Sequence, residues 1–598
     1  MNILELLFII VSVMACFSPS YCLEESVSNL GSIVVSKKKV PAFGFEPAEG
    51  SILGQQFSGS TLGELTFSGV DLQSRSPLGD IQTDFVVRGG TFQDTQILLN
   101  GRRINDPQTG HFNSDIPVTI WDIEKINVLP GSDSVISGPD AVGGAVNFVL
   151  KKPQEHERFL LLTGGMDRTK SILVGISDKF KDAGIRLSLE NQQSGGFHED
   201  TDFRKFTGTI NSSIPIPDGE FTTAAGYLDK EFGAYDFYTP GSGYPSREWI
   251  KTYLINTGLS LERDGWIIKP DFIWRRHYDT FMLDKTQARS TYRNHHRNDT
   301  YTPAFYVSRD MEILGHTGVG VEYGEERIVS GNLGNHSRRH TSIYSDESKD
   351  LTYRLSASTA IRVDNFDGYE KSYTGAINLK YVFNEEHSVF TGLSRNIRVP
   401  SFTELYYNDP ITEGNSGLRV EQAVNYQFGY ACKKENLFSG ITLFLRDEKN
   451  SIDWIKYFPG QGKWRAENIQ GALAFGLEDR LGINIKKNIF LESSYIFTDK
   501  YEKDEGYIYK YGPGYAKHVN NTSLNFTMPF GLQVIGVTYK KKTGRDGWFL
   551  LNTYLSYNLN SKSCVFFKVT NACNVEYQEI EGIPQPGRWI GAGLKVSW

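Results

Sequence analysis

The sequence predicts an all-β transmembrane barrel, and three observations support this fold class. Between residues 154 and 598, segments of about ten residues alternate apolar with polar side chains, and no helical interlude separates them. The connections are short turns in some places, such as Pro459-Gly460, and long polar stretches in others. The chain also ends inside such a segment, on Trp598, so its last strand can pair with an early strand and close the sheet.

The composition excludes several other classes of protein. Aromatic residues make up 13% of the 598 residues and 59 are glycine, which suits a sheet protein with interfacial aromatic belts and tight turns. A net charge of −7 argues against nucleic-acid binding, which uses a basic surface. The motifs of serine hydrolases, zinc proteases and P-loop nucleotide hydrolases do not occur, so we expect no enzyme and no required cofactor.

The apolar N-terminus predicts an exported protein. Residues 6–17 form an uncharged apolar run that suits the core of a signal peptide and is too short for a transmembrane helix. Cleavage is expected after Cys22, which makes residues 1–22 the signal peptide, although residues 1–7 contain no Lys or Arg. A lipoprotein leader ending at Cys16 and an ordinary buried segment are the alternatives. The later cysteines are Cys432, Cys564 and Cys573, one pair of which can still form a disulfide.

The segment before the barrel carries compact motifs with paired glycines, which allow positive φ and close approach of backbones. Its four successive blocks are TDFVVRGG at 83–90, QILLNGRRI at 96–104, WDIEKINVLPG at 121–131 and SGPDAVGGAVNF at 137–148. In this order they resemble the plug domain of TonB-dependent receptors, although Asn100 and Pro130 stand where the family usually has Asp and Arg. The motif residues are Arg88, Gly89, Gly90, Gly143 and Gly144.

Blocks in the second half extend the resemblance over about residues 30–598. SRNIRVPSFTELY at 394–406 is similar to an outer-loop segment of the family, and WRAEN at 464–468 and TNACNVEY at 570–577 also fit its pattern. The resemblance implies about 22 antiparallel strands, a class in which the lumen holds a plug. It also implies an N-terminal α+β plug domain at 45–153 inside the lumen of a barrel formed by 154–598, with residues 23–44 as TonB box and linker.

The resemblance further implies the site that couples transport to energy. The β-prone residues Ser32, Ile33, Val34, Val35 and Ser36 precede the plug and resemble the TonB box. Such a peptide can add as a strand to a sheet edge of the partner protein TonB, through main-chain hydrogen bonds. An ordinary short exposed strand is the alternative.

The function implied is TonB-dependent import of a scarce, bulky nutrient across the cell outer membrane by a monomeric protein surrounded by outer-membrane lipid. We expect a small-molecule metal chelate as the ligand, with cobalamin first, because the compact length resembles the vitamin B12 receptor branch. A ferric siderophore or haem is the alternative. A passive porin or an adhesin could share the barrel, but a porin would lack the plug and the box.

Two loops supply candidate binding residues. Gln108, His111 and Phe112 lie in a polar segment after the Leu-Asn-Gly turn, which should place them at the plug apex, and we expect them to contact ligand. The alternative is a polar turn without ligand. Glu199, Asp200 and Asp202 could offer oxygen ligands to Ca²⁺, with a solvated acidic loop as the alternative. The aromatic run Tyr235–Tyr238 could present a surface to a planar ligand, with an aromatic girdle as the alternative.

Overall fold

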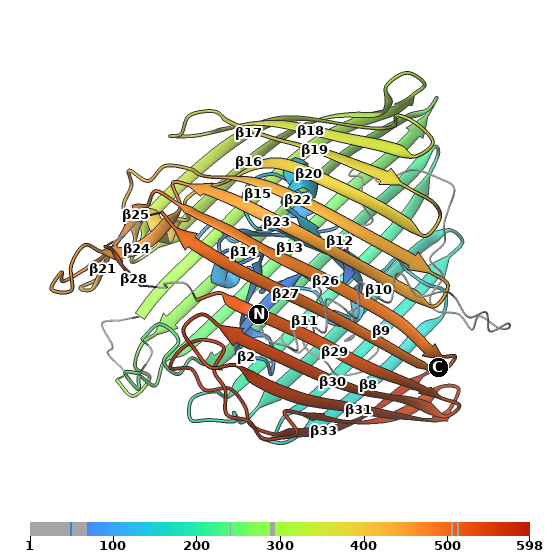
Figure 1. Ribbon diagram of the computed structural model, residues 1–598. Coiled ribbons are helices and arrows are strands. Elements are labelled where there is room, and N and C mark those ends of the chain that lie inside the picture. Colours follow the sequence, from blue (N-terminus) through green and yellow to red (C-terminus); the bar gives the residue numbers. More distant parts are fainter. Residues whose placement is uncertain (1–47, 51–68, 240, 288–292, 504–505, 511–513) are drawn as a thin grey trace.

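The barrel dominates the structure of this protein. The computed structural model describes residues 48–50, 69–239, 241–287, 293–503, 506–510 and 514–598. Twenty-two strands of the described chain form a closed barrel in which every neighbouring pair is antiparallel, and the predicted fold class is thereby confirmed (Figure 1).

The wall strands follow one another in chain order from β8 to β33. Their bounds are β8 (Glu157–Gly165), β9 (Lys170–Phe180), β10 (Ala183–Ser194), β11 (Phe203–Ile216), β12 (Gly219–Gly233), β13 (Arg247–Arg263), β14 (Trp266–Met282), β15 (Arg293–Met311), β16 (Gly315–Ser330), β17 (Gly334–Asp350), β18 (Leu355–Phe366), β19 (Ser372–Val382), β20 (His387–Arg398), β22 (Glu421–Lys434), β23 (Leu437–Lys449), β26 (Ala472–Lys486), β27 (Ile489–Glu502), β29 (Ala516–Met528), β30 (Gly531–Lys542), β31 (Trp548–Asn560), β32 (Ser563–Thr570) and β33 (Trp589–Ser597).

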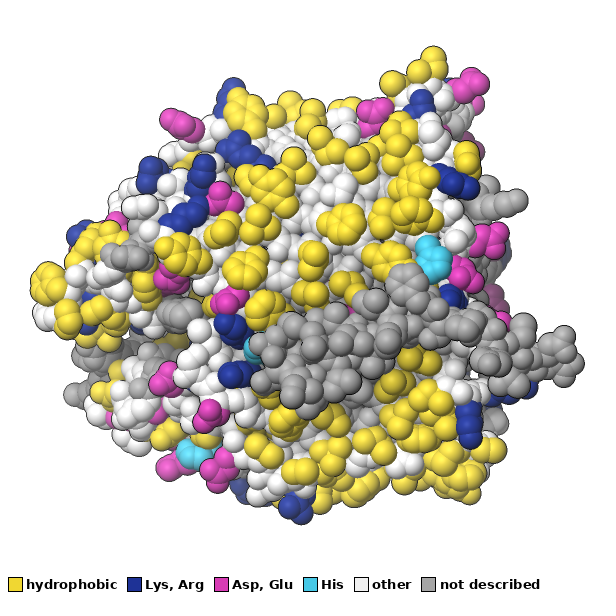
Figure 2. Space-filling view, viewed as in Figure 1, with side chains coloured by type: hydrophobic (Ala, Val, Ile, Leu, Met, Phe, Trp, Pro, Cys, Tyr) yellow, Lys and Arg dark blue, Asp and Glu magenta, His cyan; other side chains and the backbone are white. Residues whose placement is uncertain are grey.

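The alternation along each strand separates a lipid-facing row from a lumen-facing row. In β10, Ile185, Leu187 and Leu189 are exposed, whereas the intervening Arg186 and Ser188 are buried. This inverts the pattern of a soluble protein, because the outside of the barrel meets hydrocarbon and the lumen holds polar protein. Figure 2 shows the result as an apolar belt across the visible wall, with charged side chains gathered toward its two ends.

Short and long connections alternate along the wall and define two ends of the barrel. At the end called here the turn end, connections such as 181–182, 217–218 and 435–436 are short. At the opposite end, called the loop end, the connections include 234–246, 399–420, 450–471 and 571–588. In outer-membrane barrels the short turns face the periplasm and the long loops face outward.

The last strand closes the barrel. β33 pairs with β8 from Gly591 opposite Gly165 to Ser597 opposite Phe159, and the amide of Trp598 donates to the carbonyl of Arg158 at 3.1 Å. Trp598 is 54% exposed and continues the outward row of Ile590, Ala592, Leu594 and Val596, whereas Trp589 is buried in the lumen. The predicted terminal closing strand is confirmed.

Deleting Trp598 should lower the folded fraction of the protein. The deletion removes an aromatic side chain at the rim of the apolar belt and the last hydrogen bond that joins the chain end to β8. The folded fraction is measured as heat-modifiable migration on a gel. The matched control, Trp598→Phe, keeps an aromatic ring and the backbone donor and should fold like the parent, so a deletion that folds equally well would contradict this role.

The lumen holds the plug, which contains two small sheets in the described residues. One has the order β1 (Ala48–Gly50), β6 (Ile123–Pro130), β7 (Gly144–Leu150), β4 (Thr95–Leu99) and β5 (Arg102–Arg103), and the other is the hairpin of β2 (Val70–Ser76) and β3 (Ile81–Val87). The three-residue 3₁₀ helices η3 (Gly110–Phe112) and η4 (Ile120–Asp122) lie in the connection from β5 to β6, and η5 (Gly131–Asp133) and η6 (Val135–Ser137) lie in the connection from β6 to β7.

One hydrophobic core joins the plug to the wall. Ile97, Leu99 and Phe148 are fully buried at its centre, and the same cluster includes Leu254 and Ile273 from strands β13 and β14. The plug therefore packs as part of the barrel interior. Among the described residues, no helix has the length and hydropathy needed to cross a membrane.

Two additional elements lie at the loop end. The short helix α2 (Phe402–Tyr406) forms in the connection 399–420. A small sheet with the order β21 (Thr412–Glu413), β25 (Trp464–Asn468), β24 (Ile452–Lys456) and β28 (Ile508–Tyr509) combines three different connections and projects beyond the wall (Figure 1).

Candidate functional site

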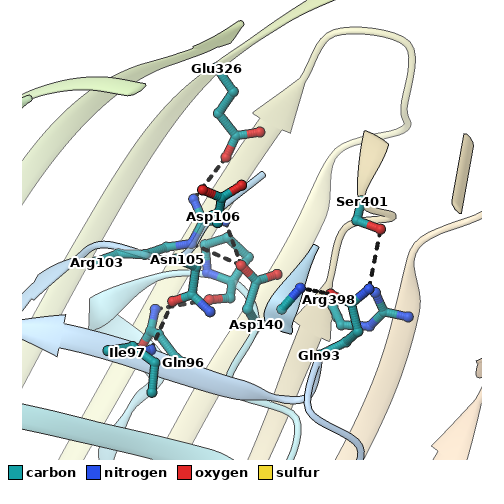
Figure 3. Close-up of polar contacts among 12 residues, drawn as sticks. Gln93, Gln96, Ile97, Arg103, Asn105, Asp106, Asp140, Glu326, Arg398 and Ser401 are labelled. Carbon is teal, nitrogen blue, oxygen red and sulfur yellow. Dashed lines mark hydrogen bonds and ion pairs between the residues drawn. The ribbon is translucent and has the colours of Figure 1, made fainter. Parts of the chain in front are cut away.

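The candidate site is the boundary between plug and wall, beginning with the two arginines of β5. Arg103 contacts Asp140 of the plug at 2.5 Å and Glu326 of β16 at 2.9 Å (Figure 3). Arg102 contacts Asp271 of β14 at 2.9 Å and Glu322 of β16 at 3.0 Å. Because burial leaves each charge dependent on its partners, these contacts fix one edge of the plug sheet to the wall.

The motif at Arg88 forms a second attachment, to strands β22 and β26. Arg88 has φ 50° and donates to both carboxylate oxygens of Glu478, at 3.0 and 2.8 Å, and to Gln427 at 3.0 Å. Its guanidinium also lies 4.9 Å from the ring centroid of Phe444. A bidentate guanidinium–carboxylate pair fixes orientation as well as distance. This motif residue therefore anchors the plug.

The motif glycines permit close approach of backbones. Gly89 has φ 68°, and a Cβ there would lie 2.5 Å from the Thr498 side chain of the wall. A Cβ on Gly143 would lie 2.7 Å from the carbonyl oxygen of Val87, and Gly144 has φ 146°. A side chain at Gly89 or Gly143 would displace the segment, which gives the glycine pattern in the sequence a physical reason.

The loop 105–113 lies at the loop end of the lumen. The Asn105 side chain accepts from the amide of Ile97 at 2.8 Å and donates to the carbonyl of Thr95 at 3.1 Å, which ties the start of the loop to β4 (Figure 3). Asp106 contacts Arg275 of β14 at 2.5 Å, and both are buried. The loop is therefore held from the plug and from the wall at the same time.

The three predicted ligand-contact residues lie in this loop, but the structure buries their side chains. Gln108 accepts from Asn298 of β15 at 2.7 Å and donates to Asp279 of β14 at 3.5 Å. His111 stacks on Phe92 with ring centroids 3.8 Å apart. Phe112 packs against His277 with a centroid distance of 4.7 Å. In this conformation their side chains contact protein, and access by a ligand requires the covering segment to move.

Burial favours the neutral form of the His111 imidazole. Burial lowers the pKa of His111, and its Nδ1 lies 3.1 Å from both carboxylate oxygens of Asp84. A neutral ring can donate one hydrogen bond to that carboxylate and stack on Phe92 at the same time. This arrangement makes the residue part of the packed apex.

A segment of the wall connection 399–420 covers the apex loop. The amide of Phe402 donates to the carbonyl of Pro107 at 2.9 Å, and the amide of Thr403 donates to the carbonyl of Gln108 at 3.1 Å. The side chain of Gln93 donates to Ser401 at 3.2 Å (Figure 3). Backbone bonds at the tip of the plug thus attach the cover directly to two apex residues.

A buried charge cluster holds the cover in place. Arg398, 2% exposed, contacts Glu404 of α2 at 2.9 Å and Glu421 of β22 at 2.5 Å. It also lies 3.6 Å from Asp94 of the plug. We call Arg398, Glu404, Glu421 and Asp94 the cover cluster. Ser401 and Glu404 form a capping box that starts α2.

Sequence reasoning missed the cover cluster, although a signal was present. The spacing Ser401-x-x-Glu404 is the capping-box pattern and occurs next to Arg398 in a segment already singled out for its resemblance. Its partner Glu421 lies at the start of β22, after the whole connection 399–420. The sequence therefore did not indicate that Glu421 contacts Arg398.

Replacing Arg398 with alanine should open the cover. The change leaves Glu404 and Glu421 buried without their cation, and removing one partner of a buried pair costs about 3–5 kcal/mol. Limited proteolysis should therefore cleave within 399–420 faster than in the parent protein. Arg395→Ala is the matched control on the same strand, because Arg395 is exposed and donates to Gln422 of the neighbouring strand β22. Equal cleavage of the two variants would contradict the role of the cluster.

The predicted calcium ligands do not converge in the structure. Asp200 is buried and paired with Lys285, and Asp202 contacts Arg247 at 3.0 Å, while Glu199 is exposed. Among the residues that the structure describes, no group of three His, Cys, Asp or Glu side chains could hold a metal ion. The described geometry therefore gives the calcium site no support, because Asp200 and Asp202 are each paired with a cation.

The remaining predicted sites have different outcomes. Ser32, Ile33, Val34, Val35 and Ser36 lie outside the described residues, so the TonB box stays a prediction. In the aromatic run, Tyr235 packs against His198 with ring centroids 4.8 Å apart and planes tilted by 54°, and Phe237 is buried in the core at the loop end. Tyr238 contacts Gln82 of the plug and Glu248 of β13. The aromatic run therefore packs against protein more than it presents an open surface.

Comparison with protein families gives two matches along the chain. Residues 186–572 match the family model described as TonB dependent receptor-like, beta-barrel. Residues 56–145 match the model of the TonB-dependent Receptor Plug Domain. The two matches fall on the wall and the plug seen in the structure.

Individual relatives are distant but extend over most of the chain. The Vitamin B12 transporter BtuB of Vibrio vulnificus is 24% identical over 446 residues, covering 69% of this chain and 67% of that protein. The iron-regulated outer membrane virulence protein of Vibrio cholerae is 21% identical and covers 87% of each chain. The crystal structure of the siderophore receptor PirA from Pseudomonas aeruginosa has a TM-score of 0.72 at 15% identity, covering 89% of this chain and 94% of PirA.

Proposed function

This chain belongs to the TonB-dependent receptors of the outer membrane, and from that premise we propose that it imports a bulky metal chelate, with a corrinoid as the first candidate. A ferric siderophore or haem is the second candidate. The family consists of receptors and transporters that depend on TonB. We further propose which residues bind the ligand and how movement of the plug lets it pass.

One observation carries the transport part of the proposal: the plug is packed and ion-paired on several sides of the lumen. Attachments reach β14 and β16 through Arg102, β22 and β26 through Arg88, and the cover through Asp94. We expect thermal motion alone to move a plug with so many buried contacts out of the lumen only slowly, because breaking each buried ion pair costs free energy. This supports an energised step and disfavours a passive porin.

The names of the relatives support the choice of ligand class. Proteins described as vitamin B12 transporters match this chain at 20–24% identity, and the iron-regulated protein of Vibrio cholerae matches at 21%. Corrinoids and ferric chelates are both too large and too scarce for uptake through passive pores. At this level of identity the ligand class is a proposal, and cobalamin leads because it is the substrate named for three of the relatives with the strongest matches.

In the proposed pathway the ligand arrives at the loop end and displaces the cover. Moving residues 399–420 would remove the backbone bonds on Pro107 and Gln108 and expose the apex loop. Gln108, His111 and Phe112 would then offer an amide, an imidazole and a phenyl ring to the chelate. TonB, bound to residues 32–36 on the periplasmic side, would supply the pull that moves the plug.

Equilibrium titration of purified full-length protein with cyanocobalamin tests the ligand. Saturable binding at micromolar ligand supports the corrinoid proposal, and ferric siderophores and haemin titrated in parallel serve as competing candidates. Absence of saturable binding by cyanocobalamin, together with binding of a ferric chelate, would move the ferric chelate to first place. Steady large conductance in liposomes would instead favour a porin.

The same titration, run with Ca²⁺ and with a chelator, tests the acidic loop. Calcium binding by Glu199, Asp200 and Asp202 stays a proposal, and it predicts tighter binding of ligand when Ca²⁺ orders the loop in advance. The pairs Asp200–Lys285 and Asp202–Arg247 would have to separate first. Binding that ignores calcium would assign these carboxylates to the ion pairs alone.

A further inference from the structure

Two carboxyl groups meet in the lumen wall at the loop end, beside the plug. Glu248 lies near the start of β13 and Asp279 near the end of β14, and both are buried. Ile250 lies opposite Asp279 in the strand register, so Glu248 and Asp279 are diagonal neighbours on the lumen face. A hydrogen bond joins their side chains. Such a bond requires one O–H, because an ionised carboxylate can only accept.

The cations that face this carboxyl pair are already engaged elsewhere. They are Lys230 of β12 and Arg75 of β2. Lys230 forms an ion pair with Asp115 of the plug, and Arg75 lies 3.5 Å from Asp84 of β3. Two carboxylates in contact cannot both stay ionised in a buried place without a cation of their own. The carboxyl pair therefore holds one proton when the lumen is packed as in this structure.

Further titratable groups face the carboxyl pair from the apex loop, the connection 234–246, β14 and β15. They are Asp106, Tyr238, His277 and His296. The hydroxyl of Tyr238 donates to Glu248 at 3.4 Å, and Nε2 of His296 lies 4.0 Å from Asp279. Asp106 is ion-paired with the wall, as described above. The imidazoles could add positive charge, and His296 is the one within reach of Asp279, so it is tested separately below.

The plug binds both members of the carboxyl pair directly. Nε2 of Gln82 donates to Glu248 at 2.9 Å, and Nε2 of Gln108 donates to Asp279 at 3.5 Å. Gln82 lies in β3 with φ 44°, a backbone conformation that a residue other than glycine keeps only where its surroundings hold it. Gln108 belongs to the apex loop 105–113. The carboxyl pair therefore holds both the hairpin of β2 and β3 and the apex loop against the wall.

We propose that Glu248 and Asp279 share one proton that locks the apex of the plug to the wall, and that loss of this proton releases the apex. With the proton, the two carboxyl groups attract each other and offer oxygens to Gln82 and Gln108. Without it, two adjacent negative charges repel, and the boundary must open to admit water or cations. The locked state holds one proton more than the open state, so the lock weakens as the pH rises. The lock rests on the proposed function in that it regulates access to the apex loop, but it operates without ligand.

Hydrogen–deuterium exchange of the purified, ligand-free full-length protein in detergent tests the lock. Exchange of the amides of β3 and of the apex loop 105–113 is measured over a series of pH values and corrected for the intrinsic chemical rate. Above the pH at which the pair titrates, protection of these amides should fall about tenfold per pH unit, because each opening releases one proton. Protection that does not change with pH would overturn the proposal. No ligand is present, so failure of the proposed import function would leave this result unaffected.

Replacing one member of the carboxyl pair with its amide should close the lock at every pH. In Glu248→Gln the amide donates a hydrogen bond to Asp279, as the protonated carboxyl does, and has no proton to lose. Protection of the apex amides should match the parent at low pH and stay constant as the pH rises. Asp279→Asn makes the same exchange in the other member, and heat-modifiable migration shows which variants are folded. A folded amide variant that keeps the pH dependence of the parent would overturn the proposal.

Two control variants separate the carboxyl pair from other titrating groups. Asp346→Asn removes a buried carboxyl of β17 near the turn end, far from the apex, and should keep the pH dependence of the parent. His296→Gln removes the imidazole nearest Asp279 and should keep it as well. Loss of the pH dependence in Asp346→Asn would show an effect of overall charge, and loss in His296→Gln would assign the proton to the imidazole. Either result would overturn the proposal.

Discussion

Replacing Val34 with proline should abolish uptake of the ligand by cells while leaving the affinity of the purified protein for the ligand unchanged. A strand that adds to the sheet edge of TonB must donate main-chain hydrogen bonds, and proline has no N–H to donate. Residues 32–36 precede the plug and lie outside the described residues, so this expectation rests on the sequence alone. Uptake of labelled ligand and equilibrium binding are the two measurements.

The matched control is Val27→Pro, which makes the same substitution in the same predicted segment, 23–44, but before the box. This variant should transport normally, because only the box pairs with TonB. Normal uptake by Val34→Pro would show that the box is assigned to the wrong residues. Loss of both uptake and binding would show instead that the segment contributes to the ligand site.

Tying the plug to the wall with a disulfide should stop transport in oxidised cells and allow it after reduction. A Cβ built on Gly392 of β20 would lie 3.0 Å from Oγ of Ser132 in η5, and Ser132 is buried in the plug. This separation suits the Cβ and the distal sulfur of a disulfide whose S–S bond is about 2.05 Å. Ser132→Cys with Gly392→Cys should therefore crosslink once the ends of the Asn378 and Gln427 side chains, 2.5 and 2.9 Å from that Cβ, turn aside.

The crosslink is expected to separate binding from transport. The apex and the loops keep their geometry, so ligand affinity should be retained, while the plug can no longer leave β20. The background protein has Cys432, Cys564 and Cys573 replaced by serine, and each single-cysteine variant serves as a control that cannot crosslink. Full uptake by the oxidised double variant would show that the plug near Ser132 does not need to leave the wall.

The sequence could predict the architecture because the relevant signals are local. Alternation along β33 shows its two faces directly, and the chain end on Trp598 indicated a closing strand before its partner β8 was known. The motif blocks around Arg88 and Gly143 located the plug by their resemblance to the family, and the tight backbone approach at Gly89 and Gly143 gives the glycines a physical reason. These features depend on a few neighbouring residues.

The binding residues were harder to predict because exposure depends on distant segments. Gln108, His111 and Phe112 were expected at the apex by their place after a turn, and the loop does lie at the loop end of the lumen. Their side chains are buried because β14, β15 and the cover at 399–420 meet there. The acidic loop had a similar outcome, since Lys285 of the connection after β14 and Arg247 of β13 pair with its carboxylates.

The sequence by itself determined the alternation of side chains between the two faces of each strand and the positions of the glycines. It also determined which types of side chain stand at each end of the barrel. The tertiary structure decided which charges meet: Arg88 and Glu478 are 390 residues apart in the chain, and Arg398 joins Glu404 and Glu421 with Asp94 of the plug. The physical reason is that a buried charge is stable only beside its partner, and barrel closure brings those partners together from segments that lie far apart in the chain.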